Sequence, residues 1–107
     1  MNQELTEKLF TMKILLELTT FKLHMLQCRP QEIFASAYEI DTMLCIYEIL
    51  EELYEEEEDL DLERLIAVPE LLTFLYDQWI ETENYRKEEL YAFVEKAVQD
   101  LSGGSMR

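Results

Sequence analysis

Glycine is absent from the first 102 residues of this 107-residue chain, whose two glycines are Gly103 and Gly104. Without glycine, the chain cannot form the Gly-rich loops that cradle phosphates or the dinucleotide-binding fingerprint. It also lacks the residue that tight hairpin turns favour. Proline is equally rare, at Pro30 and Pro69 alone. The sequence therefore predicts an all-α fold of long helices without strands.

Apolar residues recur at helical spacing through almost the whole chain. We expect a first helix over residues 3–27, a second over 30–57, a third from about Leu62 and a last one ending near Leu101. Pro69 should kink or restart the third helix. A register shift predicts a turn near residues 81–84, and one unbroken helix over 69–101 is the alternative. The prediction is a small antiparallel four-helix bundle over residues 1–101, followed by a flexible tail at 102–107.

The first helix carries two apolar stripes on roughly opposite sides. One stripe contains Leu5, Leu9, Met12, Leu16, Leu23 and Leu26, and the other contains Phe10, Ile14, Phe21 and Met25. A helix that is apolar on two sides either lies between layers of its own fold or contacts another chain. Two interpretations stay open. The helix is central in the bundle, or it forms a seam with a second copy or a partner, and the stripe of Phe10, Ile14, Phe21 and Met25 is the candidate for self-association.

Negative charge is concentrated in residues 30–63. That segment holds 13 acidic residues and no basic one, whereas the other 73 residues hold 11 acidic and 9 basic residues, and the chain's net charge is −15. A surface this acidic repels nucleic acid and anionic membranes, and it attracts basic grooves of proteins. The same segment predicts a second helix with an apolar core arc, which consists of Ile33, Ala37, Ile40, Met43, Leu44, Tyr47, Leu50 and Tyr54, widened by Ile46, Ile49 and Leu53.

Acidic residues on the polar side of this second helix are the candidate contacts to a partner. Carboxylates one helical turn apart are separated by about 5–6 Å, a distance similar in scale to that between successive phosphates of a nucleic-acid strand. Such a face suits a Lys/Arg groove built for nucleic acid. The alternative is a solvated acidic face without a partner. The predicted contacts are Asp41, Glu48, Glu51, Glu52, Glu55, Glu58 and Asp59.

No catalytic residue, metal ligand set or cofactor site is predicted. Two carboxylates can serve as acid and base, but here they crowd an exposed helix face that implies no cleft, so we do not expect an enzyme. Asp59, Asp61, Glu63 and Glu70 occupy positions 1, 3, 5 and 12 of a calcium loop. Arg64 stands where the turn of that loop requires glycine, so at most weak calcium or magnesium binding is expected.

Other features bear on the compartment. Cys28 and Cys45 lie in helical surroundings and predict small buried thiols rather than a disulfide. No apolar run reaches the ~20 residues that cross a bilayer. The N-terminal residues lack the layout of a signal peptide. The expected location is the cytoplasm, without contact to membranes.

One stretch carries a family resemblance, and it consists of Pro30-Gln31-Glu32-Ile33-Phe34-Ala35-Ser36-Ala37-Tyr38-Glu39-Ile40. It resembles a family of small, acidic, helical proteins of unknown function from bacterial mobile elements, and residues 71–98 are compatible with that family. Small acidic proteins of this kind are also similar to phage- or plasmid-borne inhibitors of host defence, including anti-CRISPR proteins. The resemblance implies no catalytic residues.

Two functions are therefore predicted. In the first, a non-enzymatic inhibitor uses its acidic helix to occupy the basic guide-RNA or DNA channel of a host defence nuclease, such as the RNA-guided nuclease of a type II CRISPR system. In the second, the chain is a structural or adaptor module that self-associates through Phe10, Ile14, Phe21 and Met25, and its acidity serves solubility only.

Overall fold

The structure is a computed structural model that describes residues 3–56, 60–84 and 86–103. These residues form α1 (Gln3–Leu26), α2 (Pro30–Ala35), α3 (Ala37–Glu56), α4 (Leu62–Ile66), α5 (Leu71–Glu81), the 3₁₀-helix η1 (Lys87–Glu89) and α6 (Leu90–Leu101). No strand occurs in these ranges, so the all-α prediction is confirmed. The expected count of four helices is wrong, because two of the expected helices are each divided into two α-helices.

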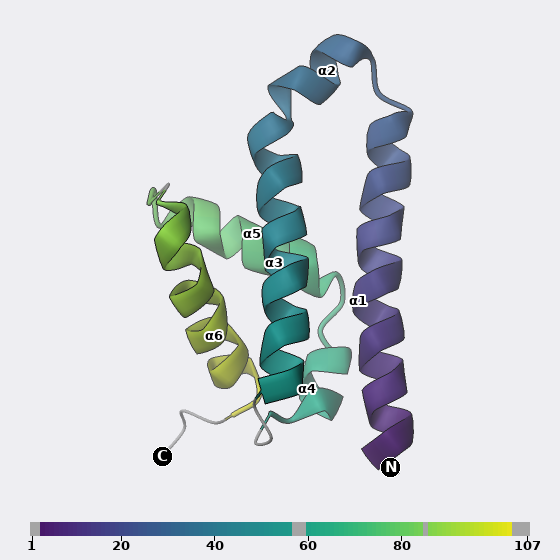
Figure 1. Cartoon of the computed structure of the whole chain (residues 1–107), viewed down its shortest axis with the longest axis vertical. Helices are drawn as coiled ribbons and strands as arrows, with labels where there is room; N and C mark the ends of the chain where they lie inside the picture. The colour runs from purple at the N-terminus through teal and green to yellow at the C-terminus, as the bar shows by residue number, and fades with distance from the viewer. Residues whose placement is uncertain (1–2, 57–59, 85, 104–107) are drawn as a thin grey trace.

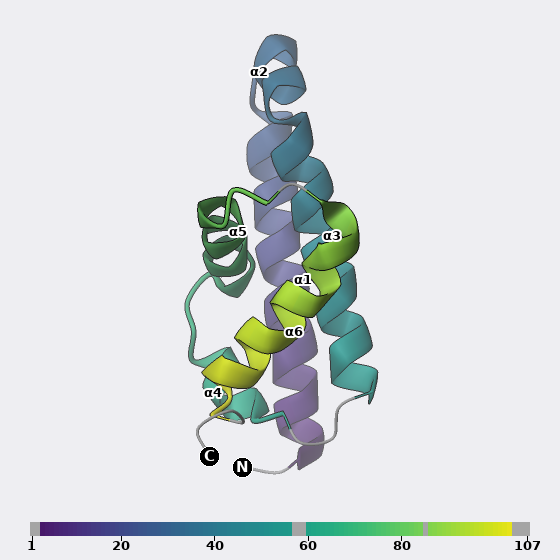
Figure 2. The same cartoon turned by 90° about the vertical axis from the view of Figure 1, so that its left-hand side faces the viewer.

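Helices α1 and α3 form a long hairpin that α2 closes at one end (Figure 1). Helix α5 crosses this hairpin, and α6 runs beside α3 on the side away from α1 (Figures 1 and 2). The closed end of the hairpin, with α2, projects beyond the other helices. Helix α3 therefore packs against α1, α5 and α6 at once. Its remaining side is exposed to solvent.

Helix α1 ends where the sequence predicts, just before Pro30. Arg29 is extended, with ψ at 154°, which is the conformation that a following proline favours. The carboxylate of Glu32 then accepts a hydrogen bond from the backbone N–H of Arg29 at 2.8 Å, as in a capping box. The expected single helix over 30–57 is wrong, since Ser36 leaves helical geometry and separates α2 from α3. Serine is a weak helix former, so the chain turns there.

The expected third helix restarts instead of kinking. Asp61 caps α4 by accepting a hydrogen bond from the backbone N–H of Arg64 at 3.3 Å, a role for which aspartate is among the preferred residues. Helix α4 ends at Ile66, and α5 begins only at Leu71, after Pro69 and after Glu70 in the left-handed region with φ of 50°. Because α5 ends at Glu81 and α6 begins at Leu90, the alternative of one helix over 69–101 is wrong.

A carboxylate from α1 caps the start of α5. Glu70, at the N-cap position, makes no side-chain cap. Instead, Oε1 of Glu17 accepts a hydrogen bond from the backbone N–H of Leu72 at 2.8 Å, and Oε2 of Glu17 lies 2.7 Å from Nζ of Lys13. The negative charge also interacts favourably with the N-terminal end of the helix dipole. This contact joins segments 55 residues apart and fixes where α5 lies against α1.

The core is continuous and receives side chains from five helices. Trp79 is its largest member, with its ring 5.3 Å from the ring of Phe93 and its Nε1–H donating to the hydroxyl of Tyr38 at 2.8 Å. The predicted arc of α3 is shifted, since Ile46, Ile49 and Leu53 are buried whereas Ala37 is exposed. The buried apolar residues are Phe10, Ile14, Leu18, Met43, Ile46, Ile49, Leu50, Leu53, Leu62, Leu65, Leu71, Leu72, Leu75, Trp79, Leu90, Val94 and Val98.

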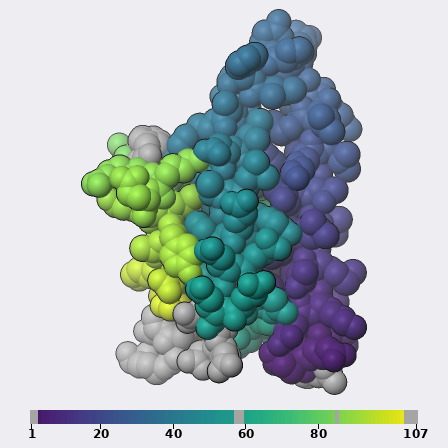
Figure 3. Space-filling view, viewed as in Figure 1, coloured from purple at the N-terminus to yellow at the C-terminus, as the bar shows by residue number. Residues whose placement is uncertain are grey.

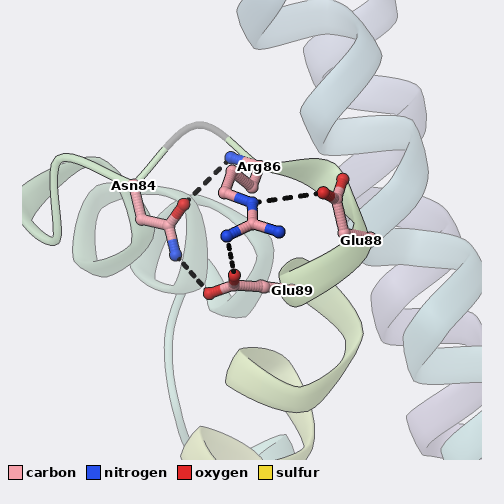
Figure 4. A network of polar contacts seen from close by, with 4 residues as sticks. All are labelled: Asn84, Arg86, Glu88 and Glu89. Atoms are coloured by element: carbon pink, nitrogen blue, oxygen red, sulfur yellow. Dashed lines mark hydrogen bonds and ion pairs between the residues drawn. The ribbon is translucent and has the colours of Figure 1, made fainter.

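The connection from α5 to α6 is held by a polar network (Figure 4). Asn84 accepts a hydrogen bond from the backbone N–H of Arg86 at 3.0 Å and donates one from its amide to Glu89 at 2.7 Å. The guanidinium of Arg86 lies 3.2 Å from Glu88 and 3.1 Å from Glu89. The single guanidinium therefore offsets one of these two negative charges, and the network presents the adjacent Lys87 to α3.

Replacing Thr42 with valine should raise the free energy of unfolding. Thr42 is fully buried in α3, and its Oγ1 has no hydrogen-bond partner among the residues that the structure describes. A methyl group in place of a hydroxyl without a partner should stabilise the fold by about 1 kcal/mol. Urea denaturation would measure the change. Thr42→Ser is the control, because it keeps the hydroxyl and loses the methyl contacts. A destabilised valine variant would show that the hydroxyl is satisfied.

Candidate functional site

Four acidic residues of α3 form a stripe on the side opposite its buried face. Asp41, Glu48, Glu52 and Glu55 follow one another at spacings of 7, 4 and 3 residues, which places them on one stripe of a helix with 3.6 residues per turn. All four are exposed, as is Glu51 on the flank of the stripe. The five described members of the predicted contact set therefore share one surface, which we call the acidic face of α3.

Figure 3 shows α3 crossing the middle of one side of the molecule, between α6 and α1. The acidic face belongs to a helix that is held on its other sides by the core. Its carboxylates are thus presented on a fixed scaffold, with about 5–6 Å between side chains one turn apart.

Asp41 differs from the rest of the acidic face because it is neutralised within the chain. Its carboxylate pairs with the ammonium of Lys87, which also lies 5.8 Å from the ring centre of Tyr38. Burial lowers the pKa of Lys87, and the thiol of Cys45 lies 3.9 Å from the same ammonium. Asp41 thus joins η1 to α3, which is a structural role.

Two tyrosines border the acidic face. The hydroxyl of Tyr47 donates to Glu51 at 3.2 Å, and the hydroxyl of Tyr91, on α6, donates to Glu56 at 3.1 Å. Burial, and then the bonded carboxylate, raise the pKa of each phenol, so both stay neutral donors. These hydrogen bonds orient Glu51 and Glu56 but leave their negative charge in place.

Glu48, Glu52 and Glu55 are the uncompensated part of the acidic face. In residues 3–56, 60–84 and 86–103, no hydrogen bond or ion pair engages their carboxylates. Burial and then the charge of Glu48 raise the pKa of the nearby Cys45 thiol, which keeps it neutral. Such a row of unpaired carboxylates attracts cationic groups.

Two predicted contacts, Glu58 and Asp59, lie outside the described residues. Residues 104–107 of the predicted tail at 102–107 also lie outside them. Asp59 is also position 1 of the calcium-loop pattern, so that position lies outside the described residues as well. Of its other members, Asp61 is engaged at the cap of α4 and lies 3.4 Å from the guanidinium of Arg64. Over the part of the chain that the structure describes, no group of three potential ligands is arranged to hold a metal ion.

The predicted self-association stripe of α1 points into the fold. Phe10 and Ile14 are each 1 % exposed, and the ring of Phe10 lies 5.8 Å from that of Tyr54. Phe21 and Met25 are half-buried. A seam between chains through Phe10 and Ile14 is therefore wrong, since these side chains already form the core between α1 and α3.

The opposite stripe of α1 is the exposed one. Leu5, Met12, Leu16, Leu23 and Leu26 are 49–76 % exposed, and Leu9 is half-buried. Sequence reasoning did not single out two further exposed apolar residues, Leu15 on α1 and Phe34 on α2. Leu15 follows Met12 by three residues and precedes Leu16, a spacing that would have placed it beside the stripe. No comparable spacing in the sequence indicates that Phe34 is exposed.

Surface depressions accompany α1 and α2. One, of about 430 Å³, is lined by residues that include Glu17, His24 and Glu70. The two oxygens of Glu17 contact the backbone N–H of Leu72 and the ammonium of Lys13. This carboxylate therefore serves to cap α5. A second, of about 350 Å³, lies between α2 and α3 and is lined mainly by apolar side chains such as Ile33, Phe34 and Leu44.

The remaining predictions concern cysteines and membranes. Cys28 and Cys45 are both free thiols, as expected, but they are half-buried and not buried. Among the described residues, no helix combines the length and the apolar character needed to cross a bilayer.

The chain was also compared with known proteins. Searches against models of protein families, curated proteins and solved structures found no match. The resemblance of residues 30–40 to proteins of mobile elements therefore stays a prediction.

Proposed function

We propose that this chain is a non-enzymatic inhibitor from a phage or mobile element that binds the basic nucleic-acid channel of a host defence nuclease through the acidic face of α3. The nuclease of a type II RNA-guided CRISPR system is the partner that we put first, which would make the chain an anti-CRISPR protein. The observation that carries the proposal is the row of uncompensated carboxylates of Glu48, Glu52 and Glu55 on a fixed helix.

The proposed mechanism is competition for a cationic groove. Grooves that bind nucleic acid hold lysine and arginine side chains that neutralise successive phosphates. Carboxylates spaced by one helical turn can pair with the same cations. Because α3 is already folded and anchored by the core, binding costs little conformational ordering of its backbone. Direct binding to nucleic acid and to membranes is not part of this function, since a net charge of −15 repels both.

Neutralising the acidic face should abolish most of the binding. The variant carries Glu48→Gln, Glu51→Gln, Glu52→Gln and Glu55→Gln, which keep side-chain volume and helix propensity and remove four negative charges. We expect affinity for the RNA-guided nuclease to fall at least about tenfold. Thermal stability should be unchanged or slightly higher, because like charges one turn apart repel. Binding to the nuclease without and with guide RNA, together with inhibition of DNA cleavage, are the measurements.

A matched control removes four exposed acids away from the acidic face and from α1: Glu70→Gln, Asp77→Asn, Glu81→Gln and Glu83→Gln. Its net charge equals that of the first variant, and its binding should stay near that of the parent. Parental binding should also weaken steeply with added salt. Full inhibition by the acidic-face variant would place the interface elsewhere, and no complex at low salt would remove the proposal.

A further inference from the structure

We propose that the outer face of α1 is the surface on which a second copy of this chain docks, in an antiparallel two-fold dimer. We define the outer face as Leu5, Leu9, Met12, Leu16, Leu23 and Leu26. With Thr19 in the remaining position, these residues follow one another at alternating spacings of four and three along the helix. That alternation is the heptad repeat by which one helix packs its side chains into those of another.

The exposed area is sufficient for a stable dimer. The members of the outer face other than Leu9 are 49–76 % exposed, and Leu15 beside them is 50 % exposed. Together these six side chains expose on the order of 700 Å², close to the roughly 800 Å² that each partner of a standard interface buries. Monomeric proteins seldom leave a contiguous apolar patch larger than about 300–600 Å². A second copy would cover this patch with an identical one.

Charge also favours α1 as the place where two copies meet. Within α1, three glutamates are balanced by three lysines, whereas α3 carries seven acidic residues and no basic one. Two chains that each carry a net charge of −15 repel least where the facing helices are neutral. Contact through α1 leaves the acidic face of α3 outside the contact, so the dimer is compatible with the proposed function and does not depend on it.

We choose the antiparallel direction because it matches apolar residues and also brings opposite charges together. When Leu5 lies opposite Leu23 of the second copy, Met12 lies opposite Leu16 of that copy, and the two-fold axis repeats both pairs. Glu4 then comes within two residues, about 3 Å along the helix axis, of the level of Lys22 of the second copy. Both residues lie on the same edge of α1, together with Lys8, and the Glu4–Lys22 pair brings opposite charges together between the copies.

Sedimentation equilibrium of the full chain over a wide concentration range tests the proposal. We expect a mass of twice 12.8 kDa at high micromolar concentration. Added salt should strengthen the dimer by screening the repulsion between two acidic chains, which is opposite in sign to the salt effect expected for binding to a basic groove. A single-chain mass at every concentration and salt level would overturn the proposal.

A triple variant, Met12→Gln, Leu16→Gln and Leu23→Gln, should weaken the dimer at least about tenfold while the helical circular-dichroism spectrum stays that of the parent, because these positions are exposed. Phe34→Gln is the control, since Phe34 is exposed but lies on α2. Equal dimerisation of parent and triple variant would show that the outer face is not the seam.

The register is tested by charge exchange. Glu4→Lys and Lys22→Glu should each weaken the dimer, and the double variant should recover the affinity of the parent, because the exchange restores the pair between the copies. Failure of the double variant to recover that affinity would overturn the antiparallel register.

Discussion

Replacing Trp79 with alanine is expected to lower the free energy of unfolding by about 3–5 kcal/mol, a large part of the 5–15 kcal/mol typical of a domain. The reason is the position of Trp79, which is 1 % exposed and joins three helices. Its ring packs against Phe93 of α6, and its Nε1–H donates to Tyr38 of α3. The cavity left by alanine would separate α5 from both neighbours. Urea denaturation followed by far-ultraviolet circular dichroism measures the loss.

Tyr38→Phe is the control for the polar part of that contact. It keeps the ring and removes the acceptor of the indole N–H, so a smaller loss of about 1–2 kcal/mol is expected. Because Trp79 is the chain's one tryptophan, its fluorescence follows unfolding of this variant directly. A loss below about 1 kcal/mol for Trp79→Ala would contradict the packing of α5 between α3 and α6.

Replacing Glu17 with alanine is expected to destabilise the protein by about 2–3 kcal/mol. The substitution leaves the backbone N–H of Leu72 at the start of α5 without its acceptor. It also leaves the ammonium of Lys13, whose side chain is 16 % exposed, without the carboxylate that lies 2.7 Å away. Thermal or urea denaturation measures the loss, and amide hydrogen exchange at Leu72 should accelerate more than exchange in α3.

Two further variants separate the cap from the ion pair. Glu17→Gln keeps an oxygen acceptor for Leu72 and removes only the charge, so it should be less harmful than Glu17→Ala. Lys13→Met in the Glu17→Ala background removes the stranded cation and should restore part of the stability. If Glu17→Ala were as stable as the parent, α5 would not depend on a cap from α1.

Secondary structure was largely determined by the sequence, because its causes are local. The absence of glycine before Gly103 and the continuous helical periodicity predict an all-α chain. Pro30 marks the end of α1, and Asp61 marks the cap of α4. The break at Ser36 was missed, because serine only weakens a helix whereas proline removes a donor and adds a clash.

The acidic face of α3 was also determined by the sequence. Residues at spacings of three, four and seven share one side of any helix, whatever surrounds it. Asp41, Glu48, Glu52 and Glu55 are therefore exposed together, opposite the buried Ile46 and Leu53. The pairing of Asp41 with Lys87 could not be predicted from the spacing, because the two residues lie on elements that meet only in the folded chain.

Only the tertiary structure decided which side of α1 is inside. Periodicity shows that a helix has two apolar stripes. Which stripe is buried depends on which one packs against α3, α4 and α5. The chain buries the stripe of Phe10 and Ile14, and it exposes that of Leu16 and Leu23. The cap of α5 by Glu17 was likewise decided by the tertiary structure. The contact joins residues 55 positions apart, so it depends on how whole helices pack and leaves no pattern in the local sequence.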